Sequence, residues 1–211
     1  NKDDESYKKL THNAWITYGM KDDADINPKN FPFTTPLVGT FNKYNCLAAI
    51  GICKVLGISD LEIRNGLKTA QPPKGREEMV YKKDFSVMID FAHTPNALIQ
   101  VLSAVKEQGY HRIIHVFGSA GKRDASKRSL MGVASCKYAD VIILTAEDPR
   151  GESVEKISFE IREGIKNASK KEQDNTLLQI PDRQEAIRQA IVMAKKGDMV
   201  IITGKGHERS M

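Results

Sequence analysis

The sequence predicts an α/β protein in which a Rossmann-like, doubly wound sheet follows the end of a different domain. From about Pro72 onward, short runs rich in β-branched residues alternate with helical patterns, as in proteins built on a parallel sheet. The residues before Pro72 show no such alternation. A segment with consecutive prolines, residues 70–75 (AQPPKG), separates the two parts and predicts a linker, with the domain boundary at residue 73.

Four runs have the length and the apolar, β-branched composition of buried strands. They are residues 85–90 (FSVMID), 112–117 (RIIHVF), 140–145 (DVIILT) and 199–203 (MVIIT), and residues 176–180 (TLLQI) are a weaker fifth. Between the first two, apolar residues from Leu98 to Val105 repeat at the spacing i, i+3, i+4 and i+7 of a helix. Thr94 is the expected N-cap of this helix, and Pro95 its first residue. The expected topology is parallel, with helical crossovers.

The part before the linker combines extended and helical segments. Residues 16–19 (ITYG) are strand-like, and a connection rich in proline and asparagine continues through Pro36. A long apolar helix is expected over residues 45–56 and a second helix near residues 61–70. We therefore predict that residues 1–73 end one domain and that residues 74–211 form most of another, cut at its end. The chain opens on Asn1 instead of Met, which also favours part of a longer protein.

Composition argues against two kinds of partner. The net charge is +5, but the basic residues are interspersed with acids and form no stripe with aromatics, so nucleic acid is not expected. No segment approaches the roughly 20 apolar residues of a membrane helix, and the first residues lack a signal peptide's apolar core. A cytoplasmic protein is expected.

Cys46, Cys53 and Cys136 stand singly, so no metal site is predicted.

Polar loops follow the predicted strands, at the edge where open parallel sheets bind ligands. Taken singly, each loop also fits a plain role as a helix cap, a solvated turn or a charged tail. Together they bring many cations to one place, which predicts an anionic ligand. The cations are Lys122, Arg123, Lys127, Arg128, Arg150 and Lys205.

Acids in the same loops make the predicted ligand zwitterionic. Arg123 and Arg150 suit bidentate contacts with carboxylates. Asp148 and Glu208 are placed to hold an ammonium group. A carboxylate beside an ammonium is the chemistry of an amino acid, so the loops predict an amino-acid site.

Six motifs carry a family resemblance. In order they are GTFNKYNCLAA, GREEMV, DFAHTPNAL, FGSAGKRDASKRSLMG, EDPRGE and GKGHE. In order and spacing they resemble the Mur ligases, most closely those of the MurE type, over essentially the whole chain. The resemblance implies that residues 1–73 are the end of a P-loop-type central ATPase domain, whose N-x-D-D turn matches residues 1–4. Residues 74–211 would be the carboxyl-terminal Rossmann-like domain.

The resemblance also implies an activity. Such ligases use ATP and Mg²⁺ to convert a carboxylate to an acyl phosphate, which the amine of an amino acid then attacks. The substrates would be UDP-N-acetylmuramoyl-L-alanyl-D-glutamate and a diamino acid, in peptidoglycan synthesis, and the enzyme would be a monomer. The phosphate-binding G-x-x-x-x-G-K-[ST] loop is not in this sequence. We therefore expect the chain alone to be inactive, and we assign no catalytic or metal-binding residue within it.

The resemblance assigns nucleotide contacts to two parts of the chain. Asn42 and Asn45 match positions that contact adenine, although Asn42 also fits a helix N-cap. Arg76 matches a hinge arginine that reaches the nucleotide. Asp90 matches the carboxylate that binds the ribose hydroxyls, with His93 and Thr94 beside it.

The amino-acid contacts implied by the resemblance fall in three loops. Arg123 matches a carboxylate-binding arginine, the segment from Asp148 through Pro149 to Arg150 matches a DNPR loop, and Gly204 and Glu208 match the positions that hold the far end of the amino acid. Supporting cations would be Lys122, Lys127, Lys205 and His207.

The identity of the diamino acid depends on two neighbouring residues. The resemblance implies that Arg150 favours meso-diaminopimelate, whose second carboxylate it would bind. Asp148 replaces the family's usual Asn and favours an extra cation such as that of lysine or ornithine. We expect meso-diaminopimelate.

Two other functions stay open: a related ligase with another acceptor, such as cyanophycin synthetase or a pseudomurein ligase, and a non-catalytic module that binds amino acid or nucleotide. The connection over residues 26–37 is shorter than is typical of the family.

Overall fold

The chain divides into two compact units, which are described separately below. The computed structural model describes residues 1–7, 15–168 and 175–206. The units are Asn1–Gln71 and Pro72–Met211, so the division lies close to the boundary expected at residue 73. His207 and Glu208, both expected to contribute to the site, lie outside the described residues.

The second unit is built on a six-stranded sheet with the order β1-β2-β6-β3-β4-β5. The strands are β1 (Glu78–Lys82), β2 (Ser86–Ile89), β3 (Ile113–Phe117), β4 (Val141–Leu144), β5 (Thr176–Gln179) and β6 (Met199–Ile202). All neighbours pair in parallel except β1, which is antiparallel to β2. The five predicted strands and the α/β class are confirmed.

Strand β1 was not predicted, and its exposure explains why. It forms the edge of the sheet, and its side chains are exposed or only half buried. Glu78 and Lys82 stand at its two ends, beside further charged residues in the sequence REEMVYKKD. An edge strand in contact with water tolerates such residues, so it lacks the apolar run by which buried strands are recognised.

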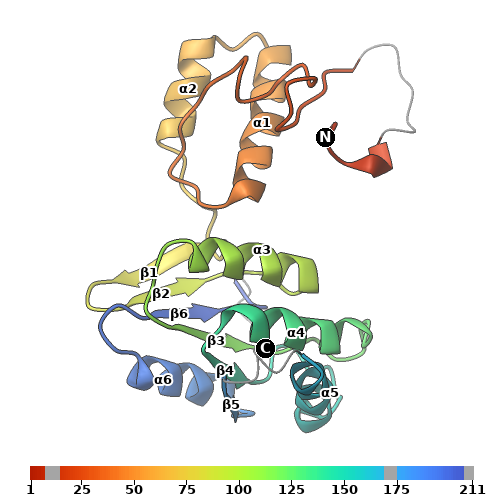
Figure 1. Ribbon diagram of the computed structural model, residues 1–211, viewed down its shortest axis with the longest axis vertical. Helices are drawn as coiled ribbons and strands as arrows, with labels where there is room; N and C mark the ends of the chain where they lie inside the picture. Colours follow the sequence, from red (N-terminus) through yellow and green to blue (C-terminus); the bar gives the residue numbers. More distant parts are fainter. Residues whose placement is uncertain (8–14, 169–174, 207–211) are drawn as a thin grey trace. The chain divides into compact units, whose positions relative to one another are not determined.

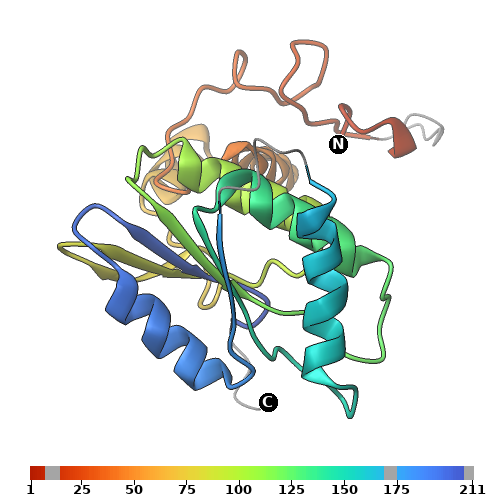
Figure 2. The ribbon, with the colours of Figure 1, turned by 60° about the horizontal axis from the view of Figure 1, so that its bottom comes forward.

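Helices cover both faces of this sheet, as a doubly wound fold requires (Figures 1 and 2). They are α3 (Pro95–Lys106), α4 (Lys127–Tyr138) and α5 (Val154–Lys166) on one face and α6 (Arg183–Met193) on the other. Strand β3 shows the division. Its Ile113 and Phe117 pack in the core beneath the three helices, and the alternating Ile114 and Val116 pack against α6.

The predicted start of α3 is confirmed in detail. Thr94 is the N-cap, and its hydroxyl oxygen accepts a hydrogen bond from the Ala97 amide (3.3 Å). Pro95 takes the first helical position, where its missing N–H costs no hydrogen bond. This arrangement fixes the direction of the chain that leaves β2.

The first unit contains the short helix η1 (Glu5–Tyr7) and the helices α1 (Thr40–Val55) and α2 (Asp60–Lys68). Helix α1 begins five residues before its predicted start, with Gly39 as the N-cap. Asn42 therefore lies inside the helix, where its amide donates to the Val38 carbonyl (2.7 Å), and its alternative role as a helix cap was wrong. The strand-like residues 16–19 form one isolated bridge, between Tyr18 and Ile26.

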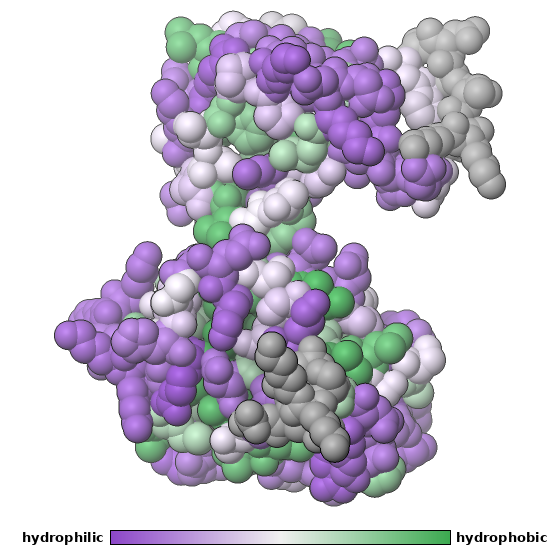
Figure 3. Space-filling model, viewed as in Figure 1, coloured by the Kyte–Doolittle hydropathy of each residue, from purple (hydrophilic) through white to green (hydrophobic). Residues whose placement is uncertain are grey.

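The described helices include none with the length and apolar character needed to cross a membrane. On the face shown in Figure 3, hydrophilic residues cover much of the surface of each unit. This agrees with the sequence, which has no long apolar segment.

Helices α4 and α5 approach so closely that their backbones touch. A Cβ atom on Gly164 of α5 would lie 1.8 Å from the Ser129 carbonyl oxygen of α4, and one on Gly132 of α4 would lie 2.2 Å from the Ile161 carbonyl oxygen. Glycine at both positions is therefore a packing requirement. The contact matters for the site because the loops that precede both helices carry predicted ligand contacts.

Replacing Gly164 with Ala is expected to lower the free energy of unfolding by about 1–3 kcal/mol, the usual cost of inserting a methyl group into a packed core. The neighbouring surface change Glu163→Ala is the control, expected to stay within about 0.5 kcal/mol of wild type. Urea unfolding followed by circular dichroism measures both. An equal effect of the two changes would contradict the close packing of α4 and α5.

Candidate functional site

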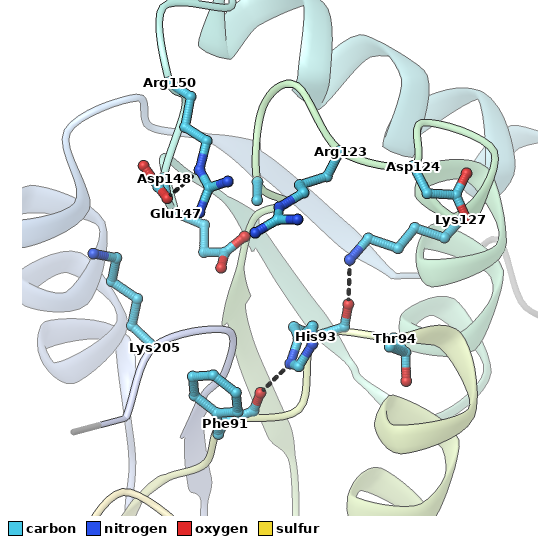
Figure 4. A pocket seen from close by; sticks show the side chains of 11 residues that line it. Phe91, His93, Thr94, Arg123, Asp124, Lys127, Glu147, Asp148, Arg150 and Lys205 are labelled. Atoms are coloured by element: carbon cyan, nitrogen blue, oxygen red, sulfur yellow. Dashed lines mark hydrogen bonds and ion pairs between the residues drawn. The ribbon is translucent and has the colours of Figure 1, made fainter. Parts of the chain in front are cut away.

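A cleft lies at the carboxyl edge of the sheet, where the predicted loops converge (Figure 4). Its volume of about 850 Å³ is in the range of small-molecule sites. The loop after β2, the loop after β3 with the start of α4, the loop after β4 and the loop after β6 all contribute. The lining residues are Phe91, His93, Thr94, Ala120, Arg123, Asp124, Lys127, Glu147, Asp148, Arg150 and Lys205.

Seven of the predicted site residues line this cleft: His93, Thr94, Arg123, Lys127, Asp148, Arg150 and Lys205. Pro149 and Gly204 lie within its loops without lining it, and Lys122 is exposed in the loop after β3. Arg76 and Asp90 do not line the cleft either, but Arg76 stacks on its lining residue Phe91. Asn42 and Asn45 belong to the first unit.

Arg128 does not face the cleft, contrary to its predicted place among the anion-facing cations. It is only 1% exposed, and its guanidinium donates to Glu152 (2.8 and 2.9 Å), to Glu160 (2.7 Å) and to the Ala120 carbonyl (3.1 Å). Two carboxylates therefore balance its charge. Arg128 joins the loop after β3 to the loop after β4 and to α5, a structural role.

Backbone contact also joins these two loops. The Gly121 amide donates to the Asp148 carbonyl (2.8 Å), and a Cβ atom on Gly121 would lie 1.8 Å from the Pro149 carbonyl oxygen. Only glycine fits so close an approach. The loops that present Arg123 and Arg150 are thus held edge to edge.

The cations of the cleft differ in what they contact. Arg150 forms an ion pair with Asp148, with a distance of 2.6 Å from Nε to Oδ2, and both side chains are partly exposed. Lys127 donates to the His93 carbonyl (2.7 Å) and so connects α4 to the loop after β2. Arg123 extends into the centre of the cleft, and no ion pair involving it is found among residues 1–7, 15–168 and 175–206. Arg123 is therefore placed to bind an incoming anion.

Glu147 is a site residue that the sequence did not single out. It is 9% exposed, its carboxylate points into the cleft, and its Oε2 has no hydrogen-bond partner in the described part of the chain. Burial raises its pKa, while the positive charges of Lys127, His93 and Arg183 act in the opposite direction. A buried carboxylate with an unused oxygen suits an ammonium ligand. The only signal for it in the sequence is its place in the polar loop that follows a strand.

Gly204 contacts Glu147 from the loop after β6. A Cβ atom on Gly204 would lie 3.0 Å from the Cγ of Glu147, and its φ of 92° also favours glycine. The first position of the GKG segment therefore leaves room for the buried carboxylate.

Asp90 organises the backbone of the loop after β2 and of the segment before β1. Its two oxygens accept hydrogen bonds from the Ala92 amide (2.7 Å) and the Glu77 amide (2.8 Å). Each oxygen keeps a second lone pair for another donor. The neighbouring Arg76 guanidinium stacks on the ring of Phe91, 3.9 Å from its centroid, and Phe91 meets His93 edge to face (4.8 Å). Arg76, Phe91 and His93 thus form one stacked group, next to the backbone that Asp90 holds.

Comparison with known proteins assigns the chain to a family. The model of the Mur ligase glutamate ligase domain matches residues 75–206. The chain belongs to the Mur ligase family. A UDP-N-acetylmuramoyl-L-alanyl-D-glutamate–2,6-diaminopimelate ligase of Aquifex aeolicus is 43% identical over 216 residues, which cover 95% of this chain and 43% of that protein. The corresponding ligase of Clostridioides difficile is 40% identical over 99% of this chain and 47% of its own length.

Solved structures show the same fold. A UDP-N-acetylmuramoyl-L-alanyl-D-glutamate–2,6-diaminopimelate ligase has a TM-score of 0.60 and 35% identity, covering 83% of this Mur ligase chain and 35% of its own. A folylpolyglutamate synthase of Mycobacterium tuberculosis, at 19% identity and a TM-score of 0.66 over 86% of this chain and 40% of its own, shares the fold alone. The chain spans less than half the length of the curated relatives described above.

Glu152, the partner of Arg128, makes a pH-dependent contribution to stability. Its hydrogen bond with Arg128 lowers its pKa from 4.5 to about 2. A carboxyl with a depressed folded-state pKa stabilises the fold above its ordinary pKa and loses this effect as the pH falls through its folded-state value. Glu152→Gln should therefore be less stable than wild type at pH 7, and the difference should shrink between pH 4.5 and about 2. Urea unfolding across this range measures it; a constant difference would contradict the pairing.

Proposed function

We propose that this chain is the amino-acid-selecting part of an ATP-dependent ligase that adds meso-diaminopimelate to UDP-N-acetylmuramoyl-L-alanyl-D-glutamate in peptidoglycan synthesis. The observation that carries the proposal is the convergence of Arg123, Arg150 and the buried Glu147 in one cleft. Relatives named for this activity match nearly the whole chain. We expect the full-length enzyme to be a cytoplasmic monomer.

In this proposal the cleft binds the two ends of the diamino acid by charge. Arg123 and Arg150 each offer a planar fork to a carboxylate, and Glu147 accepts from an ammonium group. Glu208 is proposed to join them. Holding the amino acid fixed presents its reacting amine to the acyl phosphate, so that a C–N bond forms while the C–O bond to phosphate breaks and the amine loses a proton.

The Arg150–Asp148 contact bears on which diamino acid is chosen. The extra negative charge of Asp148 had favoured a ligand with an extra cation, such as lysine. The 2.6 Å ion pair places the guanidinium of Arg150 against that charge and orients its fork. Asp148 then needs no second cation from the ligand. This balance supports meso-diaminopimelate, whose distal carboxylate offers a partner to Arg150.

Two groups of residues, one in each unit, are each proposed to contact ATP. Arg76, Asp90, His93 and Thr94 would meet the ribose and phosphates, and Asn42 and Asn45 the adenine. Asn45 is exposed and donates to the Oδ1 of Asn42 (3.2 Å), so Asn42 orients it. Magnesium would neutralise phosphate charge. Among the described residues no cluster of His, Cys, Asp and Glu suits a metal ion, so no residue here is assigned to it.

The proposal predicts a specific loss when Arg150 is replaced. In the full-length protein, supplied with ATP and the UDP-dipeptide, meso-diaminopimelate should support phosphate release far better than lysine or ornithine. Arg150→Ala should lower kcat/KM for meso-diaminopimelate by on the order of 100-fold, because a charged hydrogen-bond pair is lost, and affect lysine much less.

The exposed Lys166 on α5 gives the matched control, Lys166→Ala, which should leave all rates near wild type. Lysine as the best substrate would contradict the choice of meso-diaminopimelate. An equal effect of Arg150→Ala on both amino acids would contradict the role of Arg150.

A further inference from the structure

Arg183, the first residue of α6, is buried although arginine rarely is. It is 6% exposed. Its Nη1 donates to the Ala146 carbonyl (3.2 Å) and its Nη2 to the Thr203 carbonyl (2.9 Å). It does not line the cleft, and these two hydrogen bonds connect it to the backbone next to residues that do.

The two carbonyls lie immediately before the two loops that form one side of the cleft. Ala146 precedes Glu147, and Thr203 precedes Gly204. The two loops follow β4 and β6. These strands lie on opposite sides of β3 and are not paired with each other in the sheet. Pairing within the sheet therefore sets the distance between these loops only through β3. Arg183 connects them directly.

Further contacts hold both ends of this connection. The Ala146 amide donates to the Pro181 carbonyl (3.2 Å), so the loop after β4 is also attached to the start of α6. At the other end, the His115 ring meets the Thr203 hydroxyl (2.9 Å). Burial, with the charge of Arg183 acting in the same direction, lowers the pKa of His115 to about 3, so this ring is neutral at physiological pH. Thr203 is thus held by its hydroxyl and by its carbonyl.

We propose that Arg183 is a positioning residue for amino-acid selection, which sets the spacing between the loop bearing Glu147 and Arg150 and the loop bearing Gly204 and Lys205. The inference rests on the proposed function. The guanidinium is a rigid fork whose two nitrogens reach two carbonyls at once. A lysine ammonium at the same position keeps the charge but is a single point on a flexible stem, so it cannot fix both distances.

The test compares Arg183→Lys with wild type in the full-length protein. The KM for meso-diaminopimelate should rise by roughly 10- to 100-fold, since displacement of binding groups by about 1 Å has effects of that size. The KM for ATP should stay within about two-fold, because the proposed ATP contacts lie outside the two connected loops. Arg188→Lys on the same helix is the control, since Arg188 is exposed and pairs with Glu185.

An unchanged KM for the amino acid would overturn the inference. Equal increases in the KM for meso-diaminopimelate and the KM for ATP would also overturn it, as would loss of folding in Arg183→Lys. Either result would assign Arg183 to general stability. A wild-type protein without amino-acid-dependent turnover would defeat the proposed function instead.

In that case hydrogen exchange of the ligand-free protein still tests the positioning role. Arg183→Lys should speed exchange over residues 145–150 and 203–206 and leave the helices α4 and α5 unchanged. Identical exchange in the variant and wild type would overturn the inference.

Discussion

The cleft depends on the insertion of β6, the last strand in the described part of the chain, between β2 and β3. Ile201 pairs with Met88 on one side and with His115 on the other, so three strands from distant parts of the sequence share one register. Because all three run in parallel, the loops that follow them emerge at one edge. The parallel pairing of β4 with β3 adds the loop of Asp148 and Arg150. The adjacency of β2, β6, β3 and β4 thus places the four charged loops side by side at this edge.

Charge balance then divides the arginines of this edge into two kinds. Arg128 and Arg183 are buried, and each connects separate segments of the chain, Arg128 through two carboxylates and a carbonyl oxygen and Arg183 through two carbonyl oxygens. Arg123 and Arg150 project into the cleft, where Arg150 is oriented by Asp148. The buried pair fixes the loops from which the other pair acts. A site that discriminates between similar amino acids requires binding groups whose positions are fixed by supporting residues.

Most of the fold could be predicted because β2, β3, β4 and β6 are buried and therefore appear as apolar runs in the sequence, whereas the partly exposed β5 gave a weaker signal. Strand β1 could not, since it is half exposed and carries charges. The start of α1 was placed too late, because Gly39 caps the helix and Asn42 lies within it.

The site was predicted to the level of its loops, and less well at single residues. Parallel topology alone brings the loops together, which is why their convergence followed from the sequence. Lys127 and Arg128 are adjacent cations that the sequence does not distinguish. The turn of the helix directs Lys127 toward the cleft and Arg128 into the interior. Glu147 was missed because its importance comes from burial, which a loop sequence does not reveal.

The most direct test of the central claim is a crystal structure of the full-length protein with meso-diaminopimelate. The claim predicts that the amino acid occupies the cleft, with its distal carboxylate on the guanidinium of Arg150, another carboxylate on Arg123 and an ammonium group within hydrogen-bonding distance of Glu147 or Asp148. An amino acid bound away from these residues, or one whose carboxylates contact neither arginine, would contradict it.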